Sequence, residues 1–126
     1  MDLSILDQVP VSTSGSARES LENAVSLAQL AEELGYRRIW FSEHHGATNL
    51  ASSAPEIIVA HVASKTNTIH VGTGGIMMMH YSPLKIAETF KTLEVLHPGR
   101  IDLGVGRAPE GIAMLFLLYH KGKRRI

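Results

Sequence analysis

The stretch LGYRRIWFSEHHG, residues 34–46, decides the fold class. Gly35 suits the left-handed position at which a helix ends, and the run at residues 38–41, rich in Ile, Trp and Phe, predicts a strand. Glu43, His44 and His45 follow at the carboxyl end of that strand. The stretch therefore joins a helix end to a short strand that delivers polar side chains to its own carboxyl end.

Strand-like runs recur along the chain at a nearly constant spacing. A short apolar run covers residues 3–6, and later runs begin near positions 38, 69 and 101, which are 31 and 32 residues apart. One strand and one helix fit in each repeat, and this alternation predicts a parallel sheet with helices packed outside it. An open doubly wound sheet and the (β/α)8 barrel both fit, and in both the chemistry lies at strand carboxyl ends.

The segments between these runs carry signals for the start of a helix. Ser16 and Glu19 form a capping-box pattern, and Ser53 with Glu56 forms a second one. Ser82 precedes a proline, which is favoured at the first helical position, so we expect Ser82 to be the N-cap of a third helix. The fold class predicted from these patterns is α/β.

The composition excludes several classes of protein. The chain has 126 residues, 44% of them hydrophobic, which is enough for one folded core. Twelve basic and twelve acidic side chains cancel, so we expect neither a nucleic-acid partner nor a membrane surface. There is no cysteine, which excludes disulfides, thiolate zinc sites and thiol catalysis. No apolar run is long enough to cross a bilayer and the first ten residues do not resemble a signal peptide, so we expect a cytoplasmic protein.

Glu43, His44 and His45 form the densest polar cluster. Two histidines and a carboxylate suggest a metal, but adjacent strand residues point to opposite faces, so the two histidines cannot easily share an ion. We therefore expect no metal, and a metal-dependent hydrolase is kept only as a competing hypothesis. One histidine is expected to face a pocket as an acid, a base or a hydrogen-bonding group. The alternative is a structural histidine paired with Glu43.

Glycines interrupt the strand expected at residues 69–79. Gly72, Gly74 and Gly75 weaken a strand unless another group, such as a flat cofactor, needs close access to its backbone. A non-proline cis peptide or a β-bulge would also explain the pattern. A Rossmann phosphate loop does not fit, because the glycine spacing differs from G-x-G-x-x-G. Of the three methionines at 77–79, part is expected to pack in the core and part to line an apolar pocket.

Two basic features lie late in the sequence. Arg107 follows the strand expected at residues 101–105, where a guanidinium suits a phosphate or a carboxylate. A surface ion pair between Arg107 and Asp102 is the alternative. Four of the twelve basic residues fall within 121–126, and without interleaved aromatic residues we interpret them as a solvated end rather than a nucleic-acid site.

Taken together, several motifs resemble those of the bacterial luciferase-like flavin-dependent monooxygenases, and among them the MsnO8-like luciferase-family oxidoreductases. The resemblance runs from residue 3 to residue 109. Each motif alone is weak, but their order and spacing make a strong signal. The motifs are LGYRRIW (34–40), SEHH (42–45), ASSAP (51–55), VGTGGIM (71–77) and LHPGRIDLGVGRAP (96–109).

The resemblance implies a TIM barrel that binds reduced FMN, or a deazaflavin such as F420, at the carboxyl ends of its strands. It implies an oxidoreductase that uses O2 to oxidise a small organic substrate such as an aldehyde, with a flavin reductase supplying the reduced flavin. The protein would position the flavin and keep it dry. His44 matches the active-site histidine, a candidate general base near the flavin.

The resemblance also implies which residues bind the cofactor. Gly74 and Gly75 match a non-proline cis peptide that supports the isoalloxazine ring. Arg107 matches a position that approaches the flavin phosphate. Glu43 and Met77 stand in the same motifs, and we assign both to the cofactor site as well.

The length departs from the family pattern. A barrel of this kind needs about 250 residues, and only four strands are predicted, so we interpret residues 1–109 as the N-terminal half of a barrel. Residues 110–126 do not continue the pattern and are interpreted as a divergent or truncated tail. A half barrel exposes sheet edges and an apolar face, so we expect a homo-oligomer. A non-catalytic half barrel that binds flavin or dimerises is the alternative function.

Overall fold

The computed structural model describes residues 1–107, and every structural statement below concerns that range. Four strands alternate with three α-helices and one short 3-10 helix. The strands are β1 (Ser4–Asp7), β2 (Arg38–Phe41), β3 (His70–Met77) and β4 (Ile101–Gly106). The helices are α1 (Ala17–Glu33), α2 (Pro55–Ala63), η1 (Met78–His80) and α3 (Pro83–Leu96). The predicted order of elements is confirmed.

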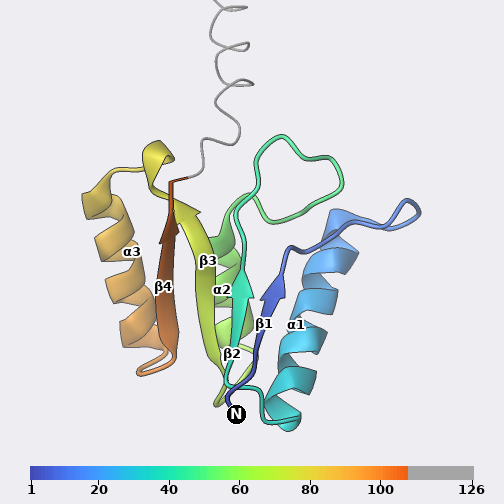
Figure 1. Cartoon of the computed structure of the whole chain (residues 1–126), viewed down its shortest axis with the longest axis horizontal. Coiled ribbons are helices and arrows are strands. Elements are labelled where there is room, and N and C mark those ends of the chain that lie inside the picture. Colours follow the sequence, from blue (N-terminus) through green and yellow to red (C-terminus); the bar gives the residue numbers. More distant parts are fainter. Residues whose placement is uncertain (108–126) are drawn as a thin grey trace, which may run out of the picture.

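The four strands form one parallel sheet in the order β1-β2-β3-β4. Parallel neighbours that follow one another in the chain need a crossover between them, and α1, α2 and α3 each supply one. These helices cover one face of the sheet and leave the other face open (Figure 1). A doubly wound sheet has helices on both faces, whereas a barrel has them only outside. The four strands and three α-helices therefore have the architecture of half a (β/α)8 barrel, as predicted.

The core lies between the sheet and the three helices. Alternate strand residues point to this side, and Ile39, Phe41 and Val71 are fully buried there. The helices contribute small and branched side chains to the same cluster: Ala24, Ala28, Ala31, Val59, Val62, Ile86, Phe90 and Leu93. No helix among the described residues is long and apolar enough to span a membrane.

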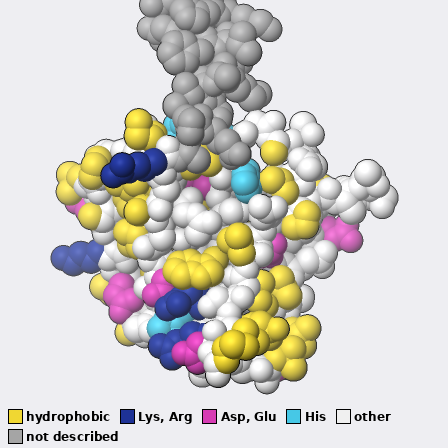
Figure 2. Space-filling model, in the orientation of Figure 1, with side chains coloured by type: hydrophobic (Ala, Val, Ile, Leu, Met, Phe, Trp, Pro, Cys, Tyr) yellow, Lys and Arg dark blue, Asp and Glu magenta, His cyan; other side chains and the backbone are white. Residues whose placement is uncertain are grey.

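The opposite face of the sheet carries apolar side chains that no described element covers. Leu6 is 56% exposed on this face, and Trp40, its neighbour on β2, is half-buried. Figure 2 shows hydrophobic side chains over the strands on this face. In a closed barrel this face is the interior, so its exposure here is what a half barrel requires.

Local signals account for the start of α1 but not for that of α2. The side chain of Ser16 accepts a hydrogen bond from the Glu19 N–H at 3.2 Å, so the first cap is confirmed. The second capping box is wrong, because the N-cap of α2 is Ala54 and has no side-chain cap. Pro55 begins this helix. Because a residue before proline is disfavoured in the helical conformation, Ala54 stays non-helical and becomes the N-cap in place of Ser53.

Two further ends differ from the sequence-based expectations. Ser82 occupies the N-cap position of α3, as predicted, but its side chain makes no capping hydrogen bond there. β3 ends at Met77 rather than at Met79, because the chain turns into η1 at Met78. The methionine run is thus divided between a strand end and a helical turn.

A part-exposed carboxylate on α1 accepts hydrogen bonds from the loop that leads into β3. The Glu32 carboxylate accepts hydrogen bonds from the N–H groups of Asn67, Thr68 and Ile69 at 2.6–3.2 Å. Partial burial raises the pKa of Glu32, but the hydrogen bonds from Ile69, Thr68 and Asn67 outweigh it and lower the pKa from 4.5 to about 2. Glu32 therefore ties the end of α1 to the loop before β3.

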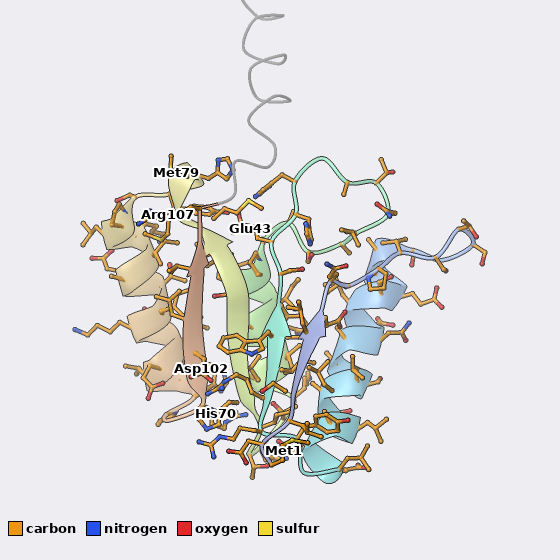
Figure 3. The ribbon with its side chains drawn as sticks, in the orientation of Figure 1. Met1, Glu43, His70, Met79, Asp102 and Arg107 are labelled. Atoms are coloured by element: carbon orange, nitrogen blue, oxygen red, sulfur yellow. The ribbon has the colours of Figure 1, made fainter. Side chains whose placement is uncertain are left out.

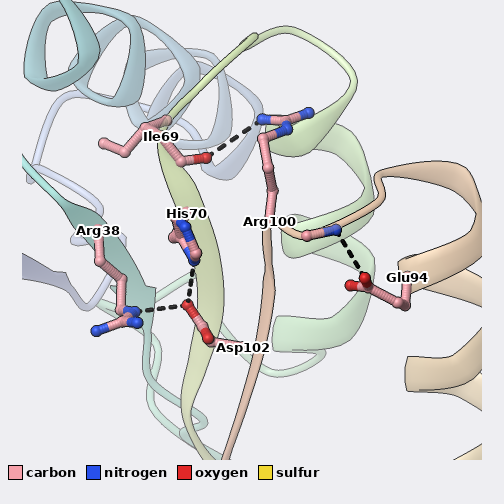
Figure 4. Close-up of polar contacts among 7 residues, drawn as sticks. Arg38, Ile69, His70, Glu94, Arg100 and Asp102 are labelled. Carbon is pink, nitrogen blue, oxygen red and sulfur yellow. Dashed lines mark hydrogen bonds and ion pairs between the residues drawn. The ribbon is translucent and has the colours of Figure 1, made fainter.

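A polar cluster lies on the open face near the amino ends of the strands. Asp102 accepts a hydrogen bond from Arg38 Nε at 2.5 Å and contacts His70 Nδ1 at 3.1 Å (Figure 4). The predicted alternative, an ion pair between Arg107 and Asp102, is therefore wrong. Five residues along a strand span about 16 Å, so Asp102 and Arg107 lie near opposite ends of β4.

Candidate active site

The carboxyl ends of the strands meet at one edge of the sheet. Figure 3 places Glu43, Met79 and Arg107 at this edge, and His70 and Asp102 toward the other end. Parallel strands bring their carboxyl ends together, which is where barrels of this type carry their active sites. The structure thus gathers the predicted site residues at one end of the sheet.

Glu43 is buried directly below this edge, with its side chain fully shielded from solvent. Its Oε2 accepts a hydrogen bond from the Met77 N–H at 2.7 Å. Its Oε1 accepts one from the Tyr81 hydroxyl at 2.6 Å and contacts His45 Nε2 at 2.6 Å. The carboxylate therefore joins the end of β2 to the end of β3 and to the segment before α3.

The two histidines occupy different environments. His45 is the one that pairs with Glu43, and its ring meets the His80 ring edge to face, with centroids 5.3 Å apart. The His44 N–H donates a hydrogen bond to the carbonyl of buried Ser52 at 2.9 Å, and His44 itself is half-buried. The structural pairing that the sequence left open thus falls to His45, and His44 stays the candidate acid or base.

The metal hypothesis gains nothing from this arrangement. Within residues 1–107, no group of three or more His, Cys, Asp or Glu side chains is placed to hold a metal ion. His45 uses its Nε2 on Glu43, which is consistent with a polar network rather than a ligand set.

Tyr81 was not among the candidates drawn from the sequence. Burial raises the pKa of its phenol, and the hydrogen bond to Glu43 and the negative charges of Glu43 and Glu56 raise it further. Tyr81 therefore keeps its proton and acts as the donor to Glu43. No sequence motif marks this contact, because it depends on the turn of η1 that brings Tyr81 back over the end of β3.

The glycine-rich segment of β3 contains the backbone feature that was expected there. The peptide bond between Gly74 and Gly75 is cis. The pairing of β3 with β4 also shifts register between Thr73 and Ile76. The cis peptide and the strand irregularity, which the sequence offered as alternatives, therefore occur together in the same four residues.

A hollow of about 350 Å³ lies over this cis peptide on the open face of the sheet. Gly74 is exposed there, and a Cβ added to it would stand 3.0 Å from the Cβ of Trp40. The volume falls in the range of small-molecule sites, and apolar walls beside bare backbone suit a planar ring. The lining residues are Leu6, Trp40, Thr73, Gly74, Gly75, Gly104 and Val105.

A larger hollow of about 690 Å³ lies between α1 and α2. It is lined by residues such as Leu21, Ile57 and His61, and by none of the strand-end candidates. Size alone would favour this hollow as a binding site. The cis peptide forms part of the smaller hollow, whereas none of the candidate residues lines the larger one.

The last two candidates differ in exposure. Met77 is buried, at 4% exposure, and contributes its N–H to Glu43. Arg107 is exposed directly after β4, at the same edge as Glu43 (Figure 3). Met79 is 65% exposed, so the methionine run is divided between core and surface, and the lining of an apolar pocket by part of it stays a prediction. Arg107 is the only charged residue among Met77, Met79 and Arg107, and its exposure leaves its guanidinium accessible to an anionic group.

The family model for luciferase-like monooxygenases matches residues 1–116. The chain belongs to this family. The resemblance seen in the motifs is thereby confirmed. The match runs past residue 109, and residues 108–126 lie outside the described part of the structure, so the divergent tail at 110–126 stays a prediction.

Relatives in the luciferase-like family cover nearly the whole chain. The uncharacterized Bacillus subtilis protein YceB is 54% identical over 123 residues, which is 98% of this chain and 37% of YceB. The luciferase-like monooxygenase of Escherichia coli K12 is 50% identical over 106 residues, 84% of this chain and 32% of its own length. The N-acetyl-S-alkylcysteine monooxygenase of B. subtilis is 48% identical over 112 residues, which is 89% of this chain and 34% of that protein. The chain thus spans about a third of the relatives it matches.

Solved structures of the family have the same fold. Apo-MsnO8 matches with a TM-score of 0.83 and 48% identity, over 85% of this chain and 32% of its own. The monooxygenase RslO1 of Streptomyces bottropensis matches with a TM-score of 0.82 and 30% identity, over 92% of this chain and 36% of RslO1. Each of these structures is matched over about a third of its own length, so the match covers only part of its barrel.

Proposed function

We propose that this chain carries the N-terminal half of a flavin-dependent monooxygenase, and that its strand-end edge binds reduced FMN. The observation that carries the proposal is the cis Gly74–Gly75 peptide, exposed beside an apolar hollow at the position where the family motif stands. The deazaflavin F420 is the alternative cofactor, because the same ring contacts suit both molecules. A cytoplasmic location belongs to the same proposal.

The residues at this edge fit a flavin. Leu6 and Trp40 offer apolar surface beside Gly74, whose missing side chain leaves the backbone open to a flat ring. Arg107 is exposed after β4, and a guanidinium binds phosphate through paired hydrogen bonds. The hollow therefore has an apolar part for the ring, and the edge has a cation for the phosphate.

The bound flavin, when reduced by a partner flavin reductase, would supply the electrons that activate O2 for oxidation of a small organic substrate such as an aldehyde. The half-buried His44 is proposed to take up or hold a proton on its imidazole during that oxidation. Glu43 and Met77 contribute through their mutual hydrogen bond, which holds β3 in place. The apolar side chains Leu6 and Trp40 would keep water away from the ring.

A second candidate function is a non-catalytic half barrel that binds flavin or assembles with another copy. The exposure of Leu6 on the uncovered face favours it, because apolar surface of this kind drives association. A homo-oligomer belongs to both candidates. An assay of aldehyde oxidation with FMN, NADH and a flavin reductase separates the two candidates. A monooxygenase raises the rate of aldehyde oxidation above that of the reductase alone, whereas a non-catalytic module leaves this rate unchanged.

Titration of the chain into FMN, followed by flavin fluorescence, tests the shared claim of cofactor binding. We expect saturable quenching, because an isoalloxazine ring stacked beside Trp40 loses its emission. Absence of quenching up to about 1 mM FMN, which corresponds to a binding free energy of only about 4 kcal/mol, would contradict the monooxygenase and the flavin-binding half barrel, and would leave only a half barrel that assembles with another copy. The same titration with F420 decides between the two cofactors.

A further inference from the structure

Two side chains of the Glu43 network have no part in the function proposed above. Tyr81 donates to Glu43 Oε1 at 2.6 Å, and His45 contacts the same oxygen through Nε2 at 2.6 Å. Glu43 Oε2 meanwhile accepts the Met77 N–H at 2.7 Å. Oε1 of Glu43 thus contacts two side chains, those of Tyr81 and His45, while Oε2 accepts a hydrogen bond from the backbone of β3.

The backbone held in this way is the continuation of the cis peptide. Met77 is the last residue of β3 and lies two residues after Gly75. The ladder between β3 and β4 shifts register between Thr73 and Ile76, so regular strand pairing is interrupted just before Met77. The Glu43 side chain therefore fixes the Met77 N–H directly after this interruption, where the pairing with β4 has just resumed at Ile76 and Met77.

We propose that Tyr81 and His45 are positioning residues of the flavin site, which act through Glu43 on the Met77 N–H and on the backbone after Gly75. The proposal rests on the proposed function for the identity of the ligand. Neither Tyr81 nor His45 needs to touch the flavin for this role.

The chemistry of the three groups explains why both side chains are needed. A carboxylate oxygen accepts hydrogen bonds, so Tyr81 serves as a donor to Glu43, and His45 does so in the tautomer that carries its proton on Nε2. A carboxylate with no solvent exposure has no water to replace a lost donor. The His80 ring, 5.3 Å from that of His45 and edge to face, holds His45 in the orientation of the contact. Loss of either donor releases Glu43, and the Met77 N–H then loses its fixed acceptor.

The first test is hydrogen exchange of the Met77 amide, measured by NMR on the full 126-residue chain without flavin. We expect Tyr81→Phe to speed this exchange on the order of tenfold, which is the weight of one hydrogen bond to a charged group. Tyr36→Phe is the matched control, because Tyr36 packs against the core at the other end of the sheet. Exchange at Met77 that is equal in Tyr81→Phe and the wild-type chain would overturn the proposal.

The second test is rescue at position 45. His45→Leu removes the donor to Glu43 and is expected to speed exchange at Met77, whereas His45→Gln keeps an N–H at a similar reach and is expected to restore slow exchange. Equal exchange in the two variants would show that His45 acts by shape alone and would contradict the proposal. This pair decides the question even if Tyr81→Phe does not fold.

The third test connects the network to the flavin. At saturating FMN, the visible circular dichroism of the bound flavin is expected to change in Tyr81→Phe and to stay as in the wild-type chain in Tyr36→Phe. An unchanged spectrum with altered exchange at Met77 would refute the link to the flavin site. Absence of FMN binding by the wild-type chain would refute the proposed function, while the exchange results would still decide the role of the network in the backbone.

Discussion

Gly75 of β3 and Val105 of β4 lie so close together that a Cβ added to Gly75 would stand 2.9 Å from the carbonyl carbon of Val105. The obstructing atoms are backbone, and the pairing of the two strands prevents them from moving aside as a flexible side chain would. Glycine at position 75 is therefore required by the packing of the sheet, whatever the site binds.

Gly75→Ala is expected to destabilise the chain by about 1–3 kcal/mol, the usual cost of forcing extra volume into a packed region. Gly106→Ala is the control, because the nearest atom to its Cβ would be 3.9 Å away. Urea denaturation followed by circular dichroism measures both. Equal midpoints for the two variants would show that β3 and β4 are not packed as described.

Arg107→Ala is expected to weaken binding of FMN by roughly 10- to 100-fold, the loss of hydrogen bonds to a charged group. Binding of riboflavin, which has no phosphate, should not change. Arg18→Ala on α1, whose side chain is 89% exposed, is the matched control for loss of one positive charge. An equal loss for FMN and riboflavin would remove Arg107 from the phosphate site.

His44→Ala is expected to lower the rate of substrate oxidation by about 10²- to 10⁴-fold, the contribution of a positioned acid or base. Its affinity for FMN should remain close to that of the wild-type chain, because the hydrogen bond of His44 to Ser52 uses the backbone N–H, which alanine keeps. The reductase-coupled oxidation assay and the fluorescence titration give the two numbers. A variant that oxidises substrate at the wild-type rate would exclude His44 as the acid or base.

Glu32 makes stability depend on pH at the acid end. Its pKa is about 2 in the folded chain against 4.5 for the unperturbed group. The ionised form of the carboxylate is therefore more favoured in the folded chain than in the unfolded chain. The stabilisation is complete above about pH 4.5 and is lost as the pH falls toward 2. Urea midpoints measured across this window should fall less steeply with pH in Glu32→Gln than in the wild-type chain. Glu22→Gln, at an exposed ion pair on α1, should keep the wild-type slope.

Features set by neighbouring residues could be predicted from the sequence. The Ser16 cap and the stop at Gly35, which has a φ of 78°, depend on a few adjacent residues, and the strand at residues 38–41 matches β2 residue for residue. The cap at Ala54 was missed because proline at position 55 outweighs the capping box that Ser53 offers.

Contacts between distant segments could be predicted only in part. The strand-end location of Glu43 and Arg107 follows from parallel topology, which the repeat already indicates. The hydrogen bond from Tyr81 to Glu43 joins residues 38 positions apart through an unpredicted 3-10 turn. The pairing of Asp102 with Arg38, 64 positions away, depends on the register of three strands, which no sequence motif encodes.

The most direct test of the central claim is the location of FMN on the chain, measured by changes in amide and indole NMR signals during titration. The account predicts that the largest shifts fall on Gly74, Gly75 and the Trp40 indole, around the 350 Å³ hollow on the open face. Shifts concentrated on Leu21 and Ile57, around the 690 Å³ hollow between α1 and α2, would contradict it.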